Sequence, residues 1–191
     1  MFGQLRFLFQ LTRAQTIARR YFVTNGFDSA LMMLGLTMGF YSSNSVSTPV
    51  IISACLGAAI ALTISGLASA YVSETAEREK ELKELEQAIV GNLEDTAHGR
   101  AARWVPILLA MVNGFSPLLI ALFIMTPLWL SQVGIALPLT ALESSIALAF
   151  LTLFLLGAFL GTVSGRLWLW SGLRTLIIAL LTAGIILLLT G

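Results

Sequence analysis

Five long apolar runs constrain this chain of 191 residues more than any other feature of its sequence. They cover residues 21–41, 49–72, 104–130, 142–163 and 173–189. Each approaches or exceeds the ~20 residues that a helix needs to cross a hydrocarbon layer about 30 Å thick. Strands of a membrane barrel would alternate apolar and polar residues in short segments, which these continuous runs do not. With 57% hydrophobic and 11% charged residues, the chain is predicted to be an all-α integral membrane protein with five transmembrane helices.

The basic residues indicate how these helices are oriented. All 11 Lys and Arg residues lie before the first run, between the second and third, or beside the turn between the fourth and fifth. The positive-inside rule makes that side cytoplasmic. We therefore expect a multi-pass protein of the cell membrane with its N-terminus in the cytoplasm and its C-terminus outside.

The predicted organisation has four parts. Residues 1–20 place Phe7 and Leu11 on one helical face and repeat Arg every seven residues on another, which predicts an amphipathic helix on the inner membrane surface. Transmembrane helices 1 and 2 cover residues 21–72, and helices 3 to 5 cover 104–191. Between them, residues 73–103 form a cytoplasmic acidic helix and loop.

The acidic segment is predicted to continue the second span as one helix, because residues 74–90 contain neither Gly nor Pro. Its glutamates at positions 74, 77, 81 and 84 step by three, four and three residues, so Glu74, Glu77, Glu81 and Glu84 form one stripe. Carboxylates in such a stripe repel each other unless a basic group or a cation lies between them, and hard divalent cations take oxygen ligands. The alternative is a solvated surface with pairs such as Lys80–Glu84. Beside the stripe, Leu82, Leu85 and Ile89 form an apolar strip that needs a protein partner.

An aspartate, Asp28, lies within the first apolar run. An ionised side chain in a membrane costs several kcal/mol, so by default it indicates a functional site. Asn25, Met32, Gly35 and Gly39 share its helical face, which combines hard and soft ligand atoms with bare backbone and is typical of a transport pathway. The alternative is a packing face on which Asp28 accepts a hydrogen bond from a neighbouring Asn or Ser.

Prolines and glycines mark two further helices. The third run contains Pro106, Pro117 and Pro127 with Asn113 and Gly114, which predicts an interrupted hydrogen-bond ladder. Broken helices recur at ion sites of transporters, although proline kinks also occur without any site. In the fourth run, two overlapping GxxxG steps predict close packing against another helix; they are formed by Gly157, Gly161 and Gly165.

Motifs for other classes are absent from the sequence. No GxxxxGK[ST], HExxH or paired-cysteine motif occurs, and the loops are short, so an enzyme is not expected. The single cysteine, Cys55, lies in the second run and forms no intramolecular disulfide.

Three segments resemble the vacuolar iron transporter family. They are RRYFVTNGFDSALMMLGLTMGF, GLASAYVSETAEREKE and LGAFLGTVSGRLWLWSGLRTLIIALLTAG. The resemblance implies a homodimer that exports Fe²⁺, and often Mn²⁺, from the cytosol in exchange for protons. It implies that Asp28 is the family's intramembrane aspartate and that the four glutamates belong to the family's acidic cytoplasmic helix.

The chain departs from the family pattern in three places. Ala70 stands where a glutamate usually precedes the tyrosine of the second span, and the methionine used in that span is absent, with Ser65 as the nearest polar candidate. The cytoplasmic segment is much shorter than the family's metal-binding domain and contains no Met. The chain thus resembles a short member with a reduced domain.

The sequence-based hypothesis is that divalent metal collects on the acidic stripe and passes to Asp28 and Met32 between the first-span helices of two subunits. Asn25, Ser65 and Asn113 are further candidates for the pathway. The metal ligands are predicted to be Asp28, Glu74, Glu77, Glu81 and Glu84. We expect no cofactor other than the transported metal. The expected partners are membrane lipid and a second copy, with no nucleic acid.

Two alternatives remain open from the sequence. One is a non-transporting membrane scaffold whose cytoplasmic helix binds a partner through Leu82 and Leu85. The other is a transporter of another solute, such as a lipid or an organic cation.

Overall fold

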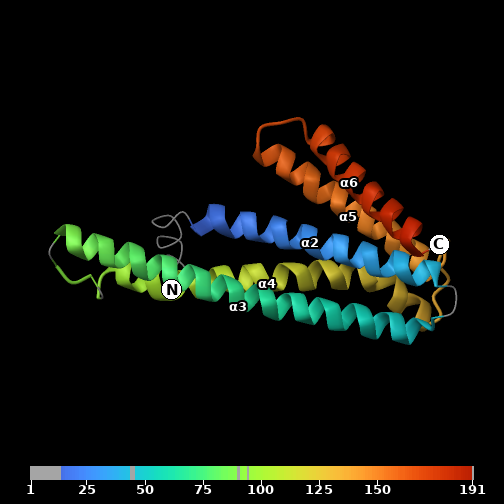
Figure 1. Ribbon diagram of the computed structural model, residues 1–191, viewed down its shortest axis with the longest axis horizontal. Helices are drawn as coiled ribbons and strands as arrows, with labels where there is room; N and C mark the ends of the chain where they lie inside the picture. Colours follow the sequence, from blue (N-terminus) through green and yellow to red (C-terminus); the bar gives the residue numbers. More distant parts are fainter. Residues whose placement is uncertain (1–13, 44–45, 90, 94, 191) are drawn as a thin grey trace. The chain divides into compact units, whose positions relative to one another are not determined.

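A computed structural model describes residues 14–43, 46–89, 91–93 and 95–190, which form five α-helices and no strand. Figure 1 shows the helices in chain order, from blue α2 to red α6. They are α2 (Ala14–Ser42), α3 (Thr48–Ile89), α4 (Ala97–Gln132), α5 (Ala141–Val163) and α6 (Trp168–Thr190). The predicted all-α class is confirmed for the described residues.

Helices α3, α4, α5 and α6 are each long and apolar enough to cross a membrane. They establish the chain as a membrane protein of the all-α class. Helix α2 does not reach the same hydropathy, because Asn25, Asp28 and Ser29 interrupt its apolar run. Four of the five predicted spans are therefore supported by composition, and the crossing by α2 stays a prediction.

The second apolar run and the acidic segment form one helix of 42 residues, as predicted. Helix α3 ends at Ile89, and the Gly91 N–H closes its last turn by donating to the Glu86 carbonyl at 3.2 Å. Helix α4 begins several residues before the predicted third span. Thr96 caps it, because its Oγ1 accepts a hydrogen bond from the His98 N–H at 3.2 Å.

The predicted surface helix at residues 1–20 lies largely outside the described residues. Its last part, residues 14–20, belongs to α2 and continues into the first apolar run without a break.

The chain divides into two compact units, which are described separately. Unit 1 consists of residues 1–25 and 63–116, and unit 2 of residues 26–62 and 117–191. Helices α2, α3 and α4 are each divided between the two units, whereas α5 and α6 lie entirely in unit 2.

Unit 2 has one apolar core to which all five helices contribute. Its fully buried side chains include Met33 and Leu34 of α2, Cys55 of α3, Ile124, Met125 and Leu128 of α4, Leu153 of α5 and Ala179 of α6. The α2 segment from residue 26 onward therefore packs within the same bundle as the four apolar helices.

A pocket of about 780 Å³ shows how the helices of unit 2 run. It is lined by Tyr41 at the end of α2, Thr48 at the start of α3, Leu128 near the end of α4, Leu142 at the start of α5 and Leu187 near the end of α6. Ends and starts alternate around one pocket, so consecutive helices of this unit are antiparallel.

Helices α5 and α6 pack closely at the predicted glycines. A Cβ on Gly157 would lie 2.9 Å from the Ser171 carbonyl oxygen, and one on Gly161 would lie 3.0 Å from the Trp168 Cα. The packing prediction is wrong for Gly165. That residue lies in the turn with φ of 67°, a left-handed conformation that glycine adopts without steric cost.

In unit 1, α4 packs against α2 through a small core that includes Ala14, Ala101, Val105 and Leu109. Helix α4 also approaches α3 closely, since a Cβ on Gly114 would lie 2.9 Å from the Thr63 carbonyl oxygen.

The prolines of α4 do not end the helix. Pro127 removes the helical donor for the Phe123 carbonyl, but the Thr126 hydroxyl donates to that oxygen at 2.8 Å. Pro117 likewise leaves the Asn113 carbonyl without its helical donor, and Gly66 of α3 packs against this oxygen, with its Cβ position 3.2 Å away. The hydrogen-bond ladder of α4 is thus interrupted at the Asn113 carbonyl, as predicted, and this oxygen faces α3.

Candidate functional site

Asp28 lies on an exposed part of α2 in unit 2. Gly35 lies seven residues later on the same face and packs against α6. A Cβ added to Gly35 would lie 3.7 Å from the Ile186 side chain. Asp28 therefore projects from the face of α2 that meets α6 further along, but it is itself not covered.

Ser29, the next residue, differs from Asp28 in both burial and hydrogen bonding. Ser29 is fully buried and its hydroxyl donates to the Pro117 carbonyl at 2.7 Å. Asp28 forms no ion pair or hydrogen bond within the described part of the chain. The hydrogen bond from a neighbouring Asn or Ser, which the alternative requires, is therefore not formed among the described residues.

Asn25 and Asn113, two of the predicted pathway residues, are brought together in unit 1. The Asn25 amide donates to the Asn113 side-chain oxygen, and the Asn113 amide donates to the Gly66 carbonyl at 2.7 Å. Asn113 is buried. This chain of amides joins α2, α4 and α3, so a structural role is established by its contacts.

The other two pathway candidates lie in different surroundings. Met32 is partly buried and packs against the apolar core of unit 2. Ser65 lies on an exposed side of α3 in unit 1.

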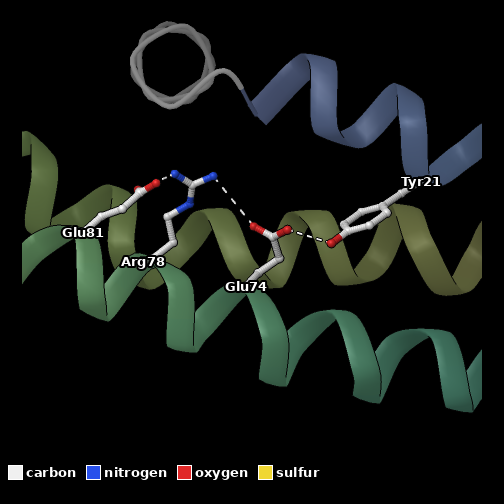
Figure 2. Close-up of polar contacts among 4 residues, drawn as sticks. All are labelled: Tyr21, Glu74, Arg78 and Glu81. Atoms are coloured by element: carbon white, nitrogen blue, oxygen red, sulfur yellow. Dashed lines mark hydrogen bonds and ion pairs between the residues drawn. The ribbon is translucent and has the colours of Figure 1, made fainter.

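Figure 2 shows the polar network built on the acidic segment of α3. The Tyr21 hydroxyl of α2 donates to Glu74 at 2.7 Å. The Arg78 guanidinium lies 3.7 Å from the same carboxylate and 2.6 Å from that of Glu81. Glu74 and Arg78 are both buried, and Glu81 is exposed. The basic group that separates these two acids is therefore Arg78.

The remaining glutamates of the stripe, Glu77 and Glu84, are exposed. Lys80 and Glu84 form the expected pair at 3.9 Å. No group of three or more His, Cys, Asp or Glu side chains that could hold a metal ion is found in the described ranges. The four glutamates do not assemble a preformed metal site there, and their role as ligands stays a prediction.

Helix α4 of the same chain lies beside part of the apolar strip, although Leu85 is 42% exposed and Ile89 is 58% exposed. Leu82 and Leu85 line a cavity of about 30 Å³ with Ala101 and His98 of α4 and with Arg78. That volume suits about one water molecule. The Arg78 Nε–H has no hydrogen-bond partner among the described residues, so a polar donor lies unsatisfied beside this cavity.

Sequence reasoning missed two members of the network, Arg78 and Tyr21. The signal for Arg78 was present, since it lies four residues after Glu74 and three before Glu81, on the same helical face. Nothing in the sequence pairs Tyr21 with Glu74, because 53 positions separate them and their contact depends on how α2 packs.

The network on α3 and the Asp28 side chain differ in how far their charges are neutralised. The network of Tyr21, Glu74 and Arg78 is largely neutralised and ties helices together. The Asp28 carboxylate has no counter-charge in the described part of the chain and is open to a ligand.

Comparisons with known proteins place the chain near one relative. No protein-family model matches it. The uncharacterized protein MJ0645 of Methanocaldococcus jannaschii is 29% identical over 167 residues, which cover 86% of this chain and 84% of the relative. No solved structure matches. The class that fold and composition define is a multi-helix membrane protein.

Proposed function

We propose that this protein is a membrane transporter that moves a divalent metal ion, Fe²⁺ or Mn²⁺, out of the cytosol with Asp28 as the intramembrane ligand. The observation that carries the proposal is the exposure of Asp28 on a helix that packs within an apolar bundle. A carboxylate facing lipid costs several kcal/mol, so such a side chain faces water, a cation or another protein surface.

The antiparallel order of unit 2 supports five spans rather than four. The α2 segment runs alongside four helices of transmembrane length and shares their core. With five crossings, Arg166 and Arg174 lie at the end of the bundle opposite the large pocket. The loops at the pocket end, residues 43–47 and 133–140, contain no Lys or Arg. The proposed orientation therefore has a cytoplasmic N-terminus and an external C-terminus in the cell membrane.

The path of the ion is proposed to begin at the acidic stripe. Arg78 pairs with Glu74 and Glu81 and Lys80 pairs with Glu84, so Glu77 is the member of the stripe that is exposed and without an ion pair among the described residues. We assign the stripe the role of attracting cations through its charge rather than binding them at a fixed site. The ion then reaches Asp28.

The resemblance to the vacuolar iron transporter family supports Fe²⁺ or Mn²⁺ as the cargo, proton exchange as the driving force and a homodimer as the working form. In the dimer, Asp28 and the Met32 thioether of the two first-span helices would hold the ion between them. Protons and metal ions compete for a desolvated carboxylate, which is the property that exchange requires.

The test is metal-driven proton movement in proteoliposomes that contain the purified protein. An imposed Mn²⁺ gradient should change the internal pH in the wild type, and Asp28→Asn should abolish the change. Glu79→Gln, which removes an exposed acid from α3, is the matched control and should transport as the wild type does. Elution as a single species and an unchanged unfolding midpoint would show that the Asn variant is folded. Normal flux through a folded Asp28→Asn variant would contradict the proposal.

The alternatives from the sequence give different outcomes. A scaffold would show no metal saturation in a titration with Fe²⁺, Mn²⁺, Zn²⁺ and Ca²⁺, and its behaviour would not depend on Asp28. Leu82 already lines a cavity with α4 of the same chain, which counts against a docking role for it, whereas Leu85 is 42% exposed. A transporter of an organic cation would depend on Asp28 but would not respond to these metals.

A further inference from the structure

The turn between α5 and α6 carries a continuous group of exposed apolar side chains. Four consecutive residues, with exposed fractions from 51% to 70%, form what we call the collar: Leu167, Trp168, Leu169 and Trp170. Trp168 is held in place by an edge-to-face contact with Phe154 of α5, with ring centroids 6.3 Å apart. The collar therefore sits on the closely packed α5–α6 hairpin.

The direction of these side chains indicates what covers them. Successive residues of a helix point about 100° apart, so Trp168, Leu169 and Trp170 at the start of α6 project to different sides, with Trp168 against α5. A protein partner would cover one side of such a collar, whereas a lipid layer surrounds it. Tryptophan is also enriched at the level of the lipid headgroups, where its ring is partly apolar and its N–H meets water.

Two arginines flank the collar. Arg166 precedes it directly, and Arg174 lies one helical turn after Trp170; both are exposed. Neither guanidinium forms an ion pair or side-chain hydrogen bond with the residues that the structure describes.

The acidic residues of unit 2 do not form ion pairs with these arginines. They are Asp28, which is unpaired, and Glu143, which closes a capping box with Thr140 at the start of α5, the opposite end of that helix from the turn. The two arginines thus have no counter-charge from an acidic side chain of unit 2. A guanidinium matches a phosphate group with two parallel hydrogen bonds.

We propose that the α5–α6 turn is a binding site for an anionic phospholipid, in which Arg166 and Arg174 hold the headgroup phosphate and the collar lies among the headgroups and the upper acyl chains. The site requires only that the chain is a membrane protein and does not depend on transport. In the proposed orientation the turn faces the cytoplasmic leaflet, where anionic lipids are enriched.

The experiment uses the full-length protein in neutral detergent, titrated with phosphatidylglycerol or phosphatidylcholine whose acyl chains carry bromine, which quenches tryptophan fluorescence. Each basic residue near an anionic surface contributes a factor of about five to binding, so phosphatidylglycerol should bind about 25-fold more tightly than phosphatidylcholine. Arg166→Gln with Arg174→Gln should remove this preference. Lys80→Gln with Lys83→Gln, which removes two exposed charges from α3, should retain it.

Further variants keep the test decisive. Trp168→Phe with Trp170→Phe should abolish the part of the quenching that Arg166 and Arg174 control, because the other tryptophans, Trp104 and Trp129, lie in α4. If the glutamine pair does not fold, Arg166→Lys with Arg174→Lys keeps both charges and should preserve most of the preference.

Three results would overturn the proposal. The first is equal affinity of the wild type for the two lipids. The second is full competition by inorganic phosphate at millimolar concentration, which would indicate a site for a free anion. The third is that the arginine variants dissociate a dimer without changing lipid preference, which would make the turn a protein interface.

Discussion

Replacing Arg78 with methionine should destabilise the protein far more than removing the closer of its two partners. The guanidinium lies 2.6 Å from Glu81, whose side chain is 49% exposed, and 3.7 Å from Glu74, whose side chain is 8% exposed. Without Arg78, the Glu74 carboxylate would keep the Tyr21 hydroxyl and lose its counter-charge. Leaving a buried charge unpaired costs about 3–5 kcal/mol. In Glu81→Gln, by contrast, an exposed pair is lost, which costs about 0–1 kcal/mol.

The assay is thermal unfolding of the purified variants in detergent, followed by tryptophan fluorescence. One kcal/mol corresponds to about 2–4 °C for a chain of this size, so Arg78→Met should lower the midpoint by roughly 6–20 °C and Glu81→Gln by a few degrees at most. Adding Glu74→Gln to Arg78→Met should recover most of the loss, because a neutral amide can still accept the hydrogen bond from Tyr21.

Burial of the carboxylate, and not the shorter distance to Arg78, should decide the loss of unfolding free energy. Equal midpoints for Arg78→Met and Glu81→Gln would refute this prediction. So would a double variant that is no more stable than Arg78→Met, since the penalty would then not arise from the Glu74 charge.

Three further predictions concern helix packing and capping. Gly157→Ala should destabilise the α5–α6 hairpin by about 1–3 kcal/mol, because its Cβ would overlap the Thr175 side chain. Gly184 has open space around it, so Gly184→Ala should be neutral or stabilising in the same unfolding assay. Asn113→Ala removes a buried amide that bonds two other helices and should cost about 1–3 kcal/mol, with faster hydrogen exchange in α3 and α4 as a second measure. Thr140→Ala removes the N-cap of α5 and should cost about 1 kcal/mol, visible as faster exchange of the first-turn amides of α5.

Much of the fold could be predicted from the sequence, because membrane helices are specified by local composition. The continuation of the second span into the acidic segment as one helix followed from the lack of Gly and Pro in residues 74–90. The close approach at Gly157 and Gly161 followed from their spacing. Helix boundaries were less accurate, since residues 14–20 join the first run as one helix and α4 begins at Ala97, before the predicted third span.

The candidate site was only partly predictable. The sequence singled out Asp28 and the four glutamates by residue type and spacing, but spacing on one helix does not say which neighbours lie opposite. The contacts that neutralise Glu74 come partly from its own helix, through Arg78, and partly from Tyr21 on another. Asn25 and Asn113 were predicted as pathway residues and are hydrogen-bonded to each other.

The sequence by itself determined that the chain is a helical membrane protein with one acid in its first apolar run, because apolar length and the cost of a charge in lipid depend on neighbouring residues alone. Only the tertiary structure decided which charges are satisfied. Arg78 is buried between two carboxylates, and Asp28 remains exposed and unpaired among the described residues. That distinction depends on which side chains the packed helices bring within a few ångströms of each other, and the order of residues along one helix does not specify it.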